Sequence, residues 1–232
     1  MCTSVITHPH TRGANALVAR EVTIGALGLA GTLHLPASAS ALVVFAHGSG
    51  SSRFSPRNMA AANALNARAI ATLLFDLLTP DEERDRSNVF DIQLLAGRLI
   101  DVVHWTDNDP ELSRLPLGLF GASTGAAAAL VAAAQLGSRI GAVVSRGGRP
   151  DLAGAALERV TAPTLLIVGG LDYGVIELNE QAFAHLTAPK AIEIVPGATH
   201  LFPEEGALEL AIAYAAHWFK THLVSHAGAS AS

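Results

Sequence analysis

Short apolar runs alternate along this chain with longer segments in which apolar residues recur at helical spacing. Continuous runs of Val, Leu, Ile and Ala are typical of strands buried on both faces. Their alternation with helices predicts an α/β fold, with a mostly parallel sheet covered on both faces. Asn88 is the expected cap of one helix, with Asp91 completing a capping box. The pattern predicts strands at 42–46, 70–75, 117–120, 140–145, 163–168 and 191–195, and helices at 56–68, 89–106, 126–134, 151–158, 176–187 and 206–221.

The first part of the chain has a different pattern. Residues 21–35 alternate partially and contain three glycines spaced three apart, which predicts an antiparallel hairpin at the sheet edge. This spacing is not the dinucleotide fingerprint and no helix follows it, so a nucleotide-binding interpretation is rejected. We expect one domain over 1–232, with a loose leader at 1–19 and a frayed tail at 226–232.

Composition narrows the class of protein. A chain of 232 residues, 50% of them hydrophobic, has ample material for one core. Its net charge of −5 gives no reason to expect nucleic acid or an anionic membrane as a partner. Cys2 is the single cysteine and no signal peptide is evident, which favours a cytoplasmic location. The uncharged segment 115–138 contains a proline and several glycines, so we interpret it as a strand and a buried helix rather than a membrane span.

Residues 121–125 read Gly-Ala-Ser-Thr-Gly, between an apolar run and an Ala-rich segment. A G-x-S-x-G between strand and helix is the signature of a nucleophile elbow, which exposes its serine hydroxyl on a sharp turn. The alternative is an ordinary glycine-rich turn, because the bare motif is weak. The distinction depends on whether a base, an orienting carboxylate and oxyanion donors accompany Ser123.

Two downstream residues are candidates for the base and the carboxylate. Asp172 follows the predicted strand 163–168, and His200 follows the next strand, 191–195. Both therefore belong at the carboxyl edge of the sheet, in the order Ser, acid, His. Taken alone, Asp172 is more typical of a turn or helix cap than of a catalytic acid, and Asp151 is the reserve candidate for the acid.

A small glycine-rich loop follows strand 42–46 and reads His47-Gly48-Ser49-Gly50. Such a loop can present a backbone N–H to a substrate carbonyl oxygen. We expect the Ser49 amide to be one oxyanion donor and the Thr124 amide, directly after the nucleophile, to be the second. His47 is expected to hold the loop in shape, and the alternative for the loop is a flexible linker.

Together these motifs resemble the α/β-hydrolase superfamily, and within it the dienelactone hydrolase-like branch. The enzymes that give the branch its name use cysteine as nucleophile, whereas this chain has Ser123, so dienelactone is not carried over as substrate. The resemblance implies a serine esterase without a cofactor, and it implies that some similar sequences are joined to a phosphoribosyltransferase-like domain. It covers about residues 21–221 and is carried by His47-Gly48-Ser49-Gly50, Gly121-Ala122-Ser123-Thr124-Gly125, Gly170-Leu171-Asp172 and Gly197-Ala198-Thr199-His200.

The short connection after strand 140–145 has no residues to spare for a cap domain, so the site is expected to be open and shallow. Two arginines, Arg53 and Arg146, fall in loops near it, where a guanidinium can hold a substrate carboxylate or phosphate. The favoured alternative is surface ion pairing with the acidic residues of segment 81–86.

No metal site is expected, because neither histidine pair in the chain is accompanied by a Cys or carboxylate cluster. The pairs are His8 with His10 and His222 with His226.

The sequence thus predicts a serine hydrolase that cleaves small or accessible carboxylic esters, or thioesters, through an acyl-enzyme. Ser123 is the expected nucleophile, His200 the base and Asp172 the residue that orients it. Two alternatives stay open: an acyltransferase with the same triad, and a non-catalytic binding module on a hydrolase fold. The partner is a small-molecule ester, and the oligomeric state is left open.

Overall fold

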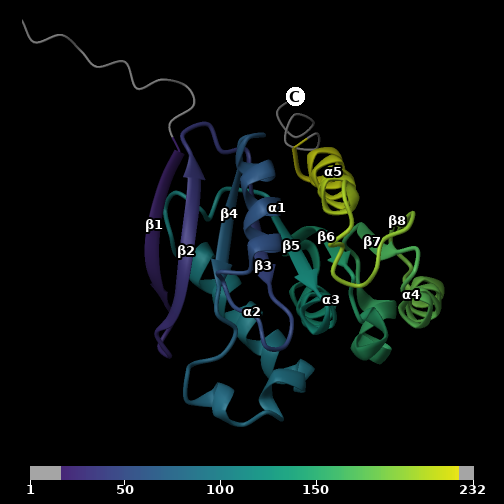
Figure 1. The fold of residues 1–232 in the computed structure, drawn as a ribbon. Helices are drawn as coiled ribbons and strands as arrows, with labels where there is room; N and C mark the ends of the chain where they lie inside the picture. Colours follow the sequence, from purple (N-terminus) through teal and green to yellow (C-terminus); the bar gives the residue numbers. More distant parts are fainter. Residues whose placement is uncertain (1–16, 225–232) are drawn as a thin grey trace, which may run out of the picture.

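An eight-stranded sheet forms the centre of the molecule in the computed structural model, which describes residues 17–224 (Figure 1). The strands lie in the order β1-β2-β4-β3-β5-β6-β7-β8. The first two form an antiparallel hairpin joined antiparallel to the fourth, and all other neighbours are parallel. In chain order they are β1 (Leu17–Ile24), β2 (Leu29–Pro36), β3 (Ala41–Ala46), β4 (Ile70–Phe75), β5 (Leu117–Ala122), β6 (Ile140–Arg146), β7 (Thr164–Gly169) and β8 (Lys190–Val195).

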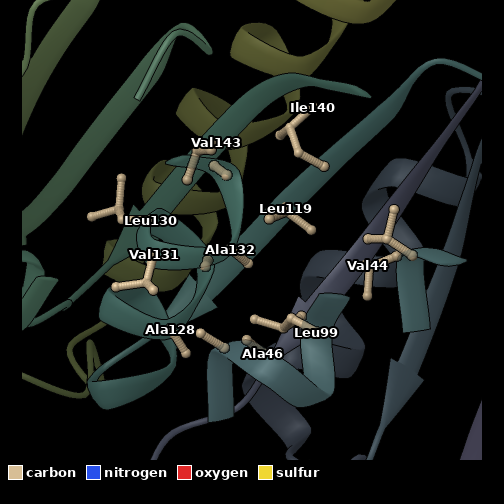
Figure 2. Close-up of a cluster of buried hydrophobic side chains, with 14 of the residues drawn as sticks. Val44, Ala46, Leu99, Leu119, Ala128, Leu130, Val131, Ala132, Ile140 and Val143 are labelled. Carbon is tan, nitrogen blue, oxygen red and sulfur yellow. The ribbon is translucent and has the colours of Figure 1, made fainter. Parts of the chain in front are cut away.

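Within residues 17–224 five α-helices cover the two faces of the sheet, and side chains of strands β3 to β8 alternate between two buried clusters. In β3, for example, Leu42 and Val44 face one cluster while Val43 and Phe45 face the other. The first cluster is built mainly with α2 and α3, as Figure 2 shows, and the second with α1 and α5. The predicted fold class is therefore confirmed. The helices are α1 (Pro56–Asn66), α2 (Ile92–Asp107), α3 (Thr124–Leu136), α4 (Tyr173–His185) and α5 (Ala207–Phe219).

The uncharged segment 115–138 consists of β5 and α3. Residues 124–133, the first ten of α3, are all buried. Their small alanine side chains let the helix pack closely on the sheet and against α2. Within residues 17–224 no helix has both the length and the apolarity needed to cross a bilayer.

Several element boundaries differ from the prediction by a few residues, and two of the differences bear on the argument. The hairpin begins at Leu17, so the last three residues of the expected leader belong to β1. The helix predicted from residue 89 begins at Ile92, because the side chain of Asp91, not that of Asn88, caps it by accepting from the Leu94 N–H at 3.0 Å. Residues 1–16 and 225–232, which hold the rest of the expected leader and the frayed tail, lie outside the described residues.

Two further segments are irregular where regular helix was predicted. The short helix expected at 151–158 is a 3₁₀ segment, Pro150–Arg159, interrupted at Gly154, whose φ of 52° is non-helical. Beyond α5 the chain continues as a π-helical turn, Lys220–Val224. Only the 3₁₀ segment and its flanking turns separate β6 from β7, so no cap domain is inserted there.

Candidate active site

The turn between β5 and α3 holds Ser123 in a strained conformation. Its φ of 52° and ψ of −124° lie in a region that residues other than glycine rarely adopt. Ser123 occupies the N-cap position of α3, yet its side chain forms no capping hydrogen bond. A serine that neither relaxes its backbone nor caps its helix has its hydroxyl available for another purpose.

Two glycines make this turn possible by letting backbone segments approach closely. A Cβ at Gly121 would lie 2.4 Å from the Ala126 Cα, and a Cβ at Gly125 would lie 2.3 Å from the Ala46 carbonyl oxygen. Real Cβ atoms do not approach other atoms so closely, so only glycine fits at either position. These contacts press the start of α3 against β3 and β5, as the nucleophile-elbow interpretation requires.

Asp172 and His200 meet at the carboxyl edge of the sheet. The carboxylate Oδ2 accepts a hydrogen bond from the His200 Nδ1 at 2.7 Å. Asp172 stands at the N-cap position of α4, but its side chain does not cap that helix and contacts the imidazole instead. Nδ1 thus carries the proton toward the carboxylate, which leaves Nε2 as the basic nitrogen.

Backbone hydrogen bonds hold the two loops that carry this pair against each other. The Gly170 N–H donates to the Val195 carbonyl at 2.8 Å, and the Leu171 N–H donates to the Ala198 carbonyl at 2.9 Å. The loop after His200 is tied in turn by Glu204, which accepts from the Thr199 N–H and hydroxyl and whose pKa is lowered by these bonds. The acid and the base are therefore fixed relative to each other by main chain as well as by their own contact.

Ser123 and His200 line one pocket of about 270 Å³. His200 keeps 38% of its side chain exposed, whereas Asp172 keeps 18%, so the base faces the pocket and the acid lies behind it. Among the described residues the Ser123 hydroxyl forms no hydrogen bond with the imidazole. Catalytic hydrogen bonds are often long in unliganded sites and shorten when substrate binds.

The loop after β3 forms another wall of this pocket. The Ser49 N–H donates to the Thr124 hydroxyl at 3.1 Å, which joins the two residues expected to supply the oxyanion donors. Gly48 lies so close to the nucleophile that a Cβ there would be 2.9 Å from the Ser123 Cβ. Thr124 opens α3, and the N–H groups of a first helical turn have no partner inside the helix.

His47 holds this loop rather than facing the pocket. Its Nε2 accepts from the Leu77 N–H at 3.1 Å, so its Nδ1 must carry the proton, which it donates to the Gly48 carbonyl at 2.9 Å. The ring is buried, and burial lowers its pKa below the ordinary value of 6.5. His47 is therefore a neutral strut between β3 and the segment after β4, which agrees with the role expected from sequence.

The structure separates two candidate residues from the pocket. Arg53 pairs with Asp76 through its side chain and its backbone N–H, and it lies 3.7 Å from a Glu21 carboxylate oxygen. Asp151, the reserve acid, forms a bidentate pair with Arg149 at 2.8 Å and makes no contact with the imidazole. Arg53 is therefore engaged away from the place where it was expected to bind substrate, and Asp151 does not orient His200.

Arg146 behaves differently, and the expected surface pairing is wrong for both arginines. Arg53 pairs outside segment 81–86, and Arg146 is buried and forms no ion pair among the described residues. Its Nη2 donates to the Asn58 Oδ1 at 3.2 Å, and it lines the pocket of Ser123. Two acids of segment 81–86 pair instead with an arginine of the same segment and with one of α2, because those lie within reach on the surface.

Two residues at the start of α1, Arg57 and Asn58, line the pocket and were not found from the sequence. Arg57 carried a detectable signal, because a cation in the first turn of a helix opposes the helix dipole. Asn58 carried none, since only the fold brings it beside Arg146.

Within residues 17–224 no group of three or more His, Cys, Asp or Glu side chains is arranged to hold a metal ion. His222 packs its ring on Trp218, with ring centres 4.3 Å apart. His226, the other histidine of that pair, lies outside the described residues, as do His8 and His10.

The sheet order, the elbow and the sites after β7 and β8 define an α/β-hydrolase. The chain belongs to the dienelactone hydrolase family, whose model matches residues 60–223. This confirms the resemblance inferred from the motifs.

Known relatives agree with this assignment. The chain is 50% identical to the dienelactone hydrolase from Anabaena variabilis ATCC 29413, with a TM-score of 0.86 over 90% of this chain and 99% of that one. Est1E from Butyrivibrio proteoclasticus shares the fold alone, with 16% identity and a TM-score of 0.72 over 88% of this chain and 98% of that one.

A longer relative is known from Mycobacterium tuberculosis (strain ATCC 25618 / H37Rv). The chain is 57% identical over 203 residues to its "Putative phosphoribosyl transferase Rv0571c". That alignment covers 88% of this chain and 46% of the relative, so the chain spans about half the length of the curated relatives it matches.

Proposed function

We propose that this hydrolase cleaves carboxylic esters or thioesters through a Ser123–His200–Asp172 triad. The observation that carries the proposal is the 2.7 Å hydrogen bond between Asp172 and His200. Asp172 occupies the N-cap position of α4, but its side chain does not cap that helix. The base it orients shares a pocket with the strained, uncapped Ser123. Capping, the competing explanation for Asp172, is thereby removed.

In the proposed reaction, His200 Nε2 takes the proton of the Ser123 hydroxyl as the oxygen attacks the substrate carbonyl carbon. Asp172 keeps the imidazole in the required tautomer and stabilises its charged form. The imidazolium then protonates the departing alcohol or thiol. Water attacks the acyl-enzyme through the same histidine, releases the carboxylic acid and restores the serine.

The developing oxyanion is assigned to the amides of Thr124 and Ser49. The Thr124 N–H stands at the start of α3, where the helix dipole favours negative charge. The Ser49 N–H is 3.1 Å from the Thr124 hydroxyl, so an oxyanion bound there would compete with this contact or share the donor. Losing a single donor of this type costs roughly a hundredfold to a thousandfold in kcat.

The surroundings of the pocket support substrates of modest size. A second hollow, of about 570 Å³, shares Ser49, Ser51 and Ser55 with the first and is bordered by Phe54 and Phe90. Both aromatic side chains are more than half exposed. We assign this hollow to the part of the ester farther from the scissile bond.

The proposal is tested by hydrolysis of 4-nitrophenyl acetate. Ser123→Ala and His200→Gln are expected to lower kcat/KM by a factor on the order of 10³ or more, and Asp172→Asn by a similar factor through the wrong tautomer. Ser138→Ala, an exposed serine beyond the far end of α3, is the matched control and keeps wild-type activity. Equal rates for the wild type and Ser123→Ala would refute the proposal.

Acyl transfer is distinguished from hydrolysis by the products. With methanol or a primary amine added to the same assay, a hydrolase releases mainly the free acid. Methyl ester or amide as the main product at low acceptor concentration would assign the enzyme to the acyltransferases instead.

A further inference from the structure

The loop that follows β6, residues 147–149, contacts both the nucleophile and the base. The Arg149 N–H donates to the Ser123 carbonyl at 3.1 Å. A Cβ at Gly147 would lie 2.8 Å from the His200 carbonyl oxygen, so the loop also packs closely against the residue that carries the imidazole. The position of this loop therefore affects two members of the triad.

Ser123 needs support from outside its own turn because its backbone conformation is strained. A φ of 52° in a residue other than glycine persists only where the surrounding structure enforces it. The Ser123 carbonyl accepts one hydrogen bond from the Ala126 N–H and one from the Arg149 N–H, both at 3.1 Å. The first bond lies within the turn itself. The second comes from the loop after a neighbouring strand, so it fixes the turn relative to the sheet.

Asn179 on α4 reaches the same peptide group from its other side. Its Nδ2 donates to the Gly148 carbonyl at 3.1 Å and to the Val175 carbonyl at 2.8 Å. Carbonyl oxygens only accept, so the NH₂ group of the amide must face them. The Gly148 carbonyl and the Arg149 N–H belong to one trans peptide and point in opposite directions. Asn179 is therefore joined to Ser123 through a single peptide unit.

The burial of Asn179 is costly for a residue that only packs. Its surface is 0% exposed, and its Oδ1 is buried without a hydrogen-bond partner within residues 17–224. A leucine of similar size would avoid the cost of this unsatisfied acceptor. Local rules are broken in this way mainly at functional sites. The bond to the Gly148 carbonyl is the contact that an apolar side chain could not replace.

The peptide between Asn179 and Ser123 has little room to move. A Cβ at Gly148 would lie 2.0 Å from the Ser145 Oγ and 2.6 Å from the Ala126 Cβ. The loop is thus pressed between the end of β6 and the first turn of α3. Closely packed groups transmit a displacement to their neighbours, so a shift of this peptide reaches the nucleophile.

We infer that Asn179 is a positioning residue for the nucleophile. Its hydrogen bond orients and polarises the peptide of residues 148–149, whose N–H holds Ser123 in its strained conformation. Asn179 does not line the pocket and acts only through this peptide. Because α4 begins directly after Asp172, the same side chain also ties the helix behind the acid to the turn that carries the nucleophile. The inference rests on the proposed function in taking Ser123 as the attacking group.

Asn179→Leu tests the inference, because it removes both donors at nearly constant volume. We expect kcat on 4-nitrophenyl acetate to fall by about tenfold to a hundredfold with KM within about twofold, since a displaced Ser123 slows acylation and deacylation alike. The second-order rate constant for fluorophosphonate labelling should fall by a similar factor. Asn179→Ser, whose side chain is too short to reach Gly148, carries the same expectation wherever the leucine variant does not fold.

Asn66→Leu is the matched control. Asn66 is also buried and donates twice through its Nδ2, to the Ile70 carbonyl at 2.9 Å and the Thr72 hydroxyl at 3.0 Å. These contacts lie at the amino end of β4, whereas the triad lies at the carboxyl edge of the sheet. Asn66→Leu should therefore lower the melting temperature and leave kcat and the labelling rate unchanged.

Hydrogen exchange of the Arg149 amide tests the connecting peptide directly. Measured by NMR relative to the amides of β6, this exchange should be about tenfold faster or more in Asn179→Leu and unchanged in Asn66→Leu. Wild-type kcat, labelling and Arg149 exchange in a folded Asn179 variant would overturn the inference. Loss of activity in Ser123→Ala would leave the proposed function intact in that case, so the two can fail separately.

Discussion

At the scale of single residues, Ser123 and Asp172 share a property that capping rules do not predict. Both occupy N-cap positions, which serine and aspartate favour because their side chains bond to free helix N–H groups. Neither side chain does so here. Ser123 has a backbone conformation in which its side chain does not cap α3, and the Asp172 side chain bonds to His200 instead of capping α4. Both side chains are therefore available to an active site.

Gly48 is expected to be required for activity more than for folding. An alanine Cβ there would lie 2.9 Å from the Ser123 Cβ, so the nucleophile or the loop after β3 must shift. We expect Gly48→Ala to lower kcat on 4-nitrophenyl acetate by about tenfold or more, because misplacement by about 1 Å is costly in catalysis. Gly97→Ala, on α2 with open space around it, should leave kcat unchanged. Equal kcat for both variants would contradict the packing argument.

The buried, neutral His47 is expected to make the fold sensitive to acid. Folding lowers its pKa, so the unfolded chain takes up a proton at a higher pH than the folded one. The neutral His47 ring makes its full contribution to the free energy of unfolding above about pH 6.5, which is the ordinary pKa of histidine. This contribution is lost as the pH falls through the lower pKa of the folded state.

Melting temperatures between pH 7.5 and 5 measure this effect. We expect the wild type to lose stability over this range more steeply than His47→Gln, which has no proton to gain. His104→Gln, the change of an exposed histidine on α2, should keep the wild-type slope. A His47→Gln slope as steep as that of the wild type would remove His47 as the cause.

At the scale of elements, the active site depends on where strands end. Ser123, Asp172 and His200 directly follow or closely follow β5, β7 and β8, whose parallel directions bring their carboxyl ends to one edge. Periodicity alone located these strand ends to within two residues, because buried parallel strands are continuous apolar runs. The order of elements and the three candidate triad residues were therefore predictable from sequence.

Element boundaries were less predictable where local signals compete. Asn88 and Asp91 are both favoured N-caps, and sequence did not show that residues 88–90 form a separate 3₁₀ turn before α2. Gly154 likewise interrupts the segment predicted as a regular helix by adopting a positive φ. In both places one residue decides which local structure forms.

The capping assignment of α2 is tested by stability. Asp91→Ala removes the acceptor of the Leu94 N–H and should lower the free energy of unfolding by about 1 kcal/mol. Asn88→Ala, on the side chain first expected to cap the helix, should cost less. Urea denaturation followed by circular dichroism measures both, and a larger loss for Asn88→Ala would restore the original prediction.

At the scale of the whole molecule, sequence could not predict the partners of its arginines. Arg53 reaches Asp76 after β4, and Arg146 is enclosed by residues from β5 and α1. Such contacts depend on how loops from separate strands converge, and a single sequence contains no spacing rule for them. The surroundings of these two arginines therefore emerge only from the assembled fold.

The whole account requires one nucleophile, and labelling with a fluorophosphonate probe followed by peptide mass spectrometry locates it. We predict a single adduct, on Ser123, in the wild type and in Ser138→Ala, and no adduct in Ser123→Ala. Labelling of folded Ser123→Ala at the wild-type rate, or an adduct on a peptide without residue 123, would contradict the account.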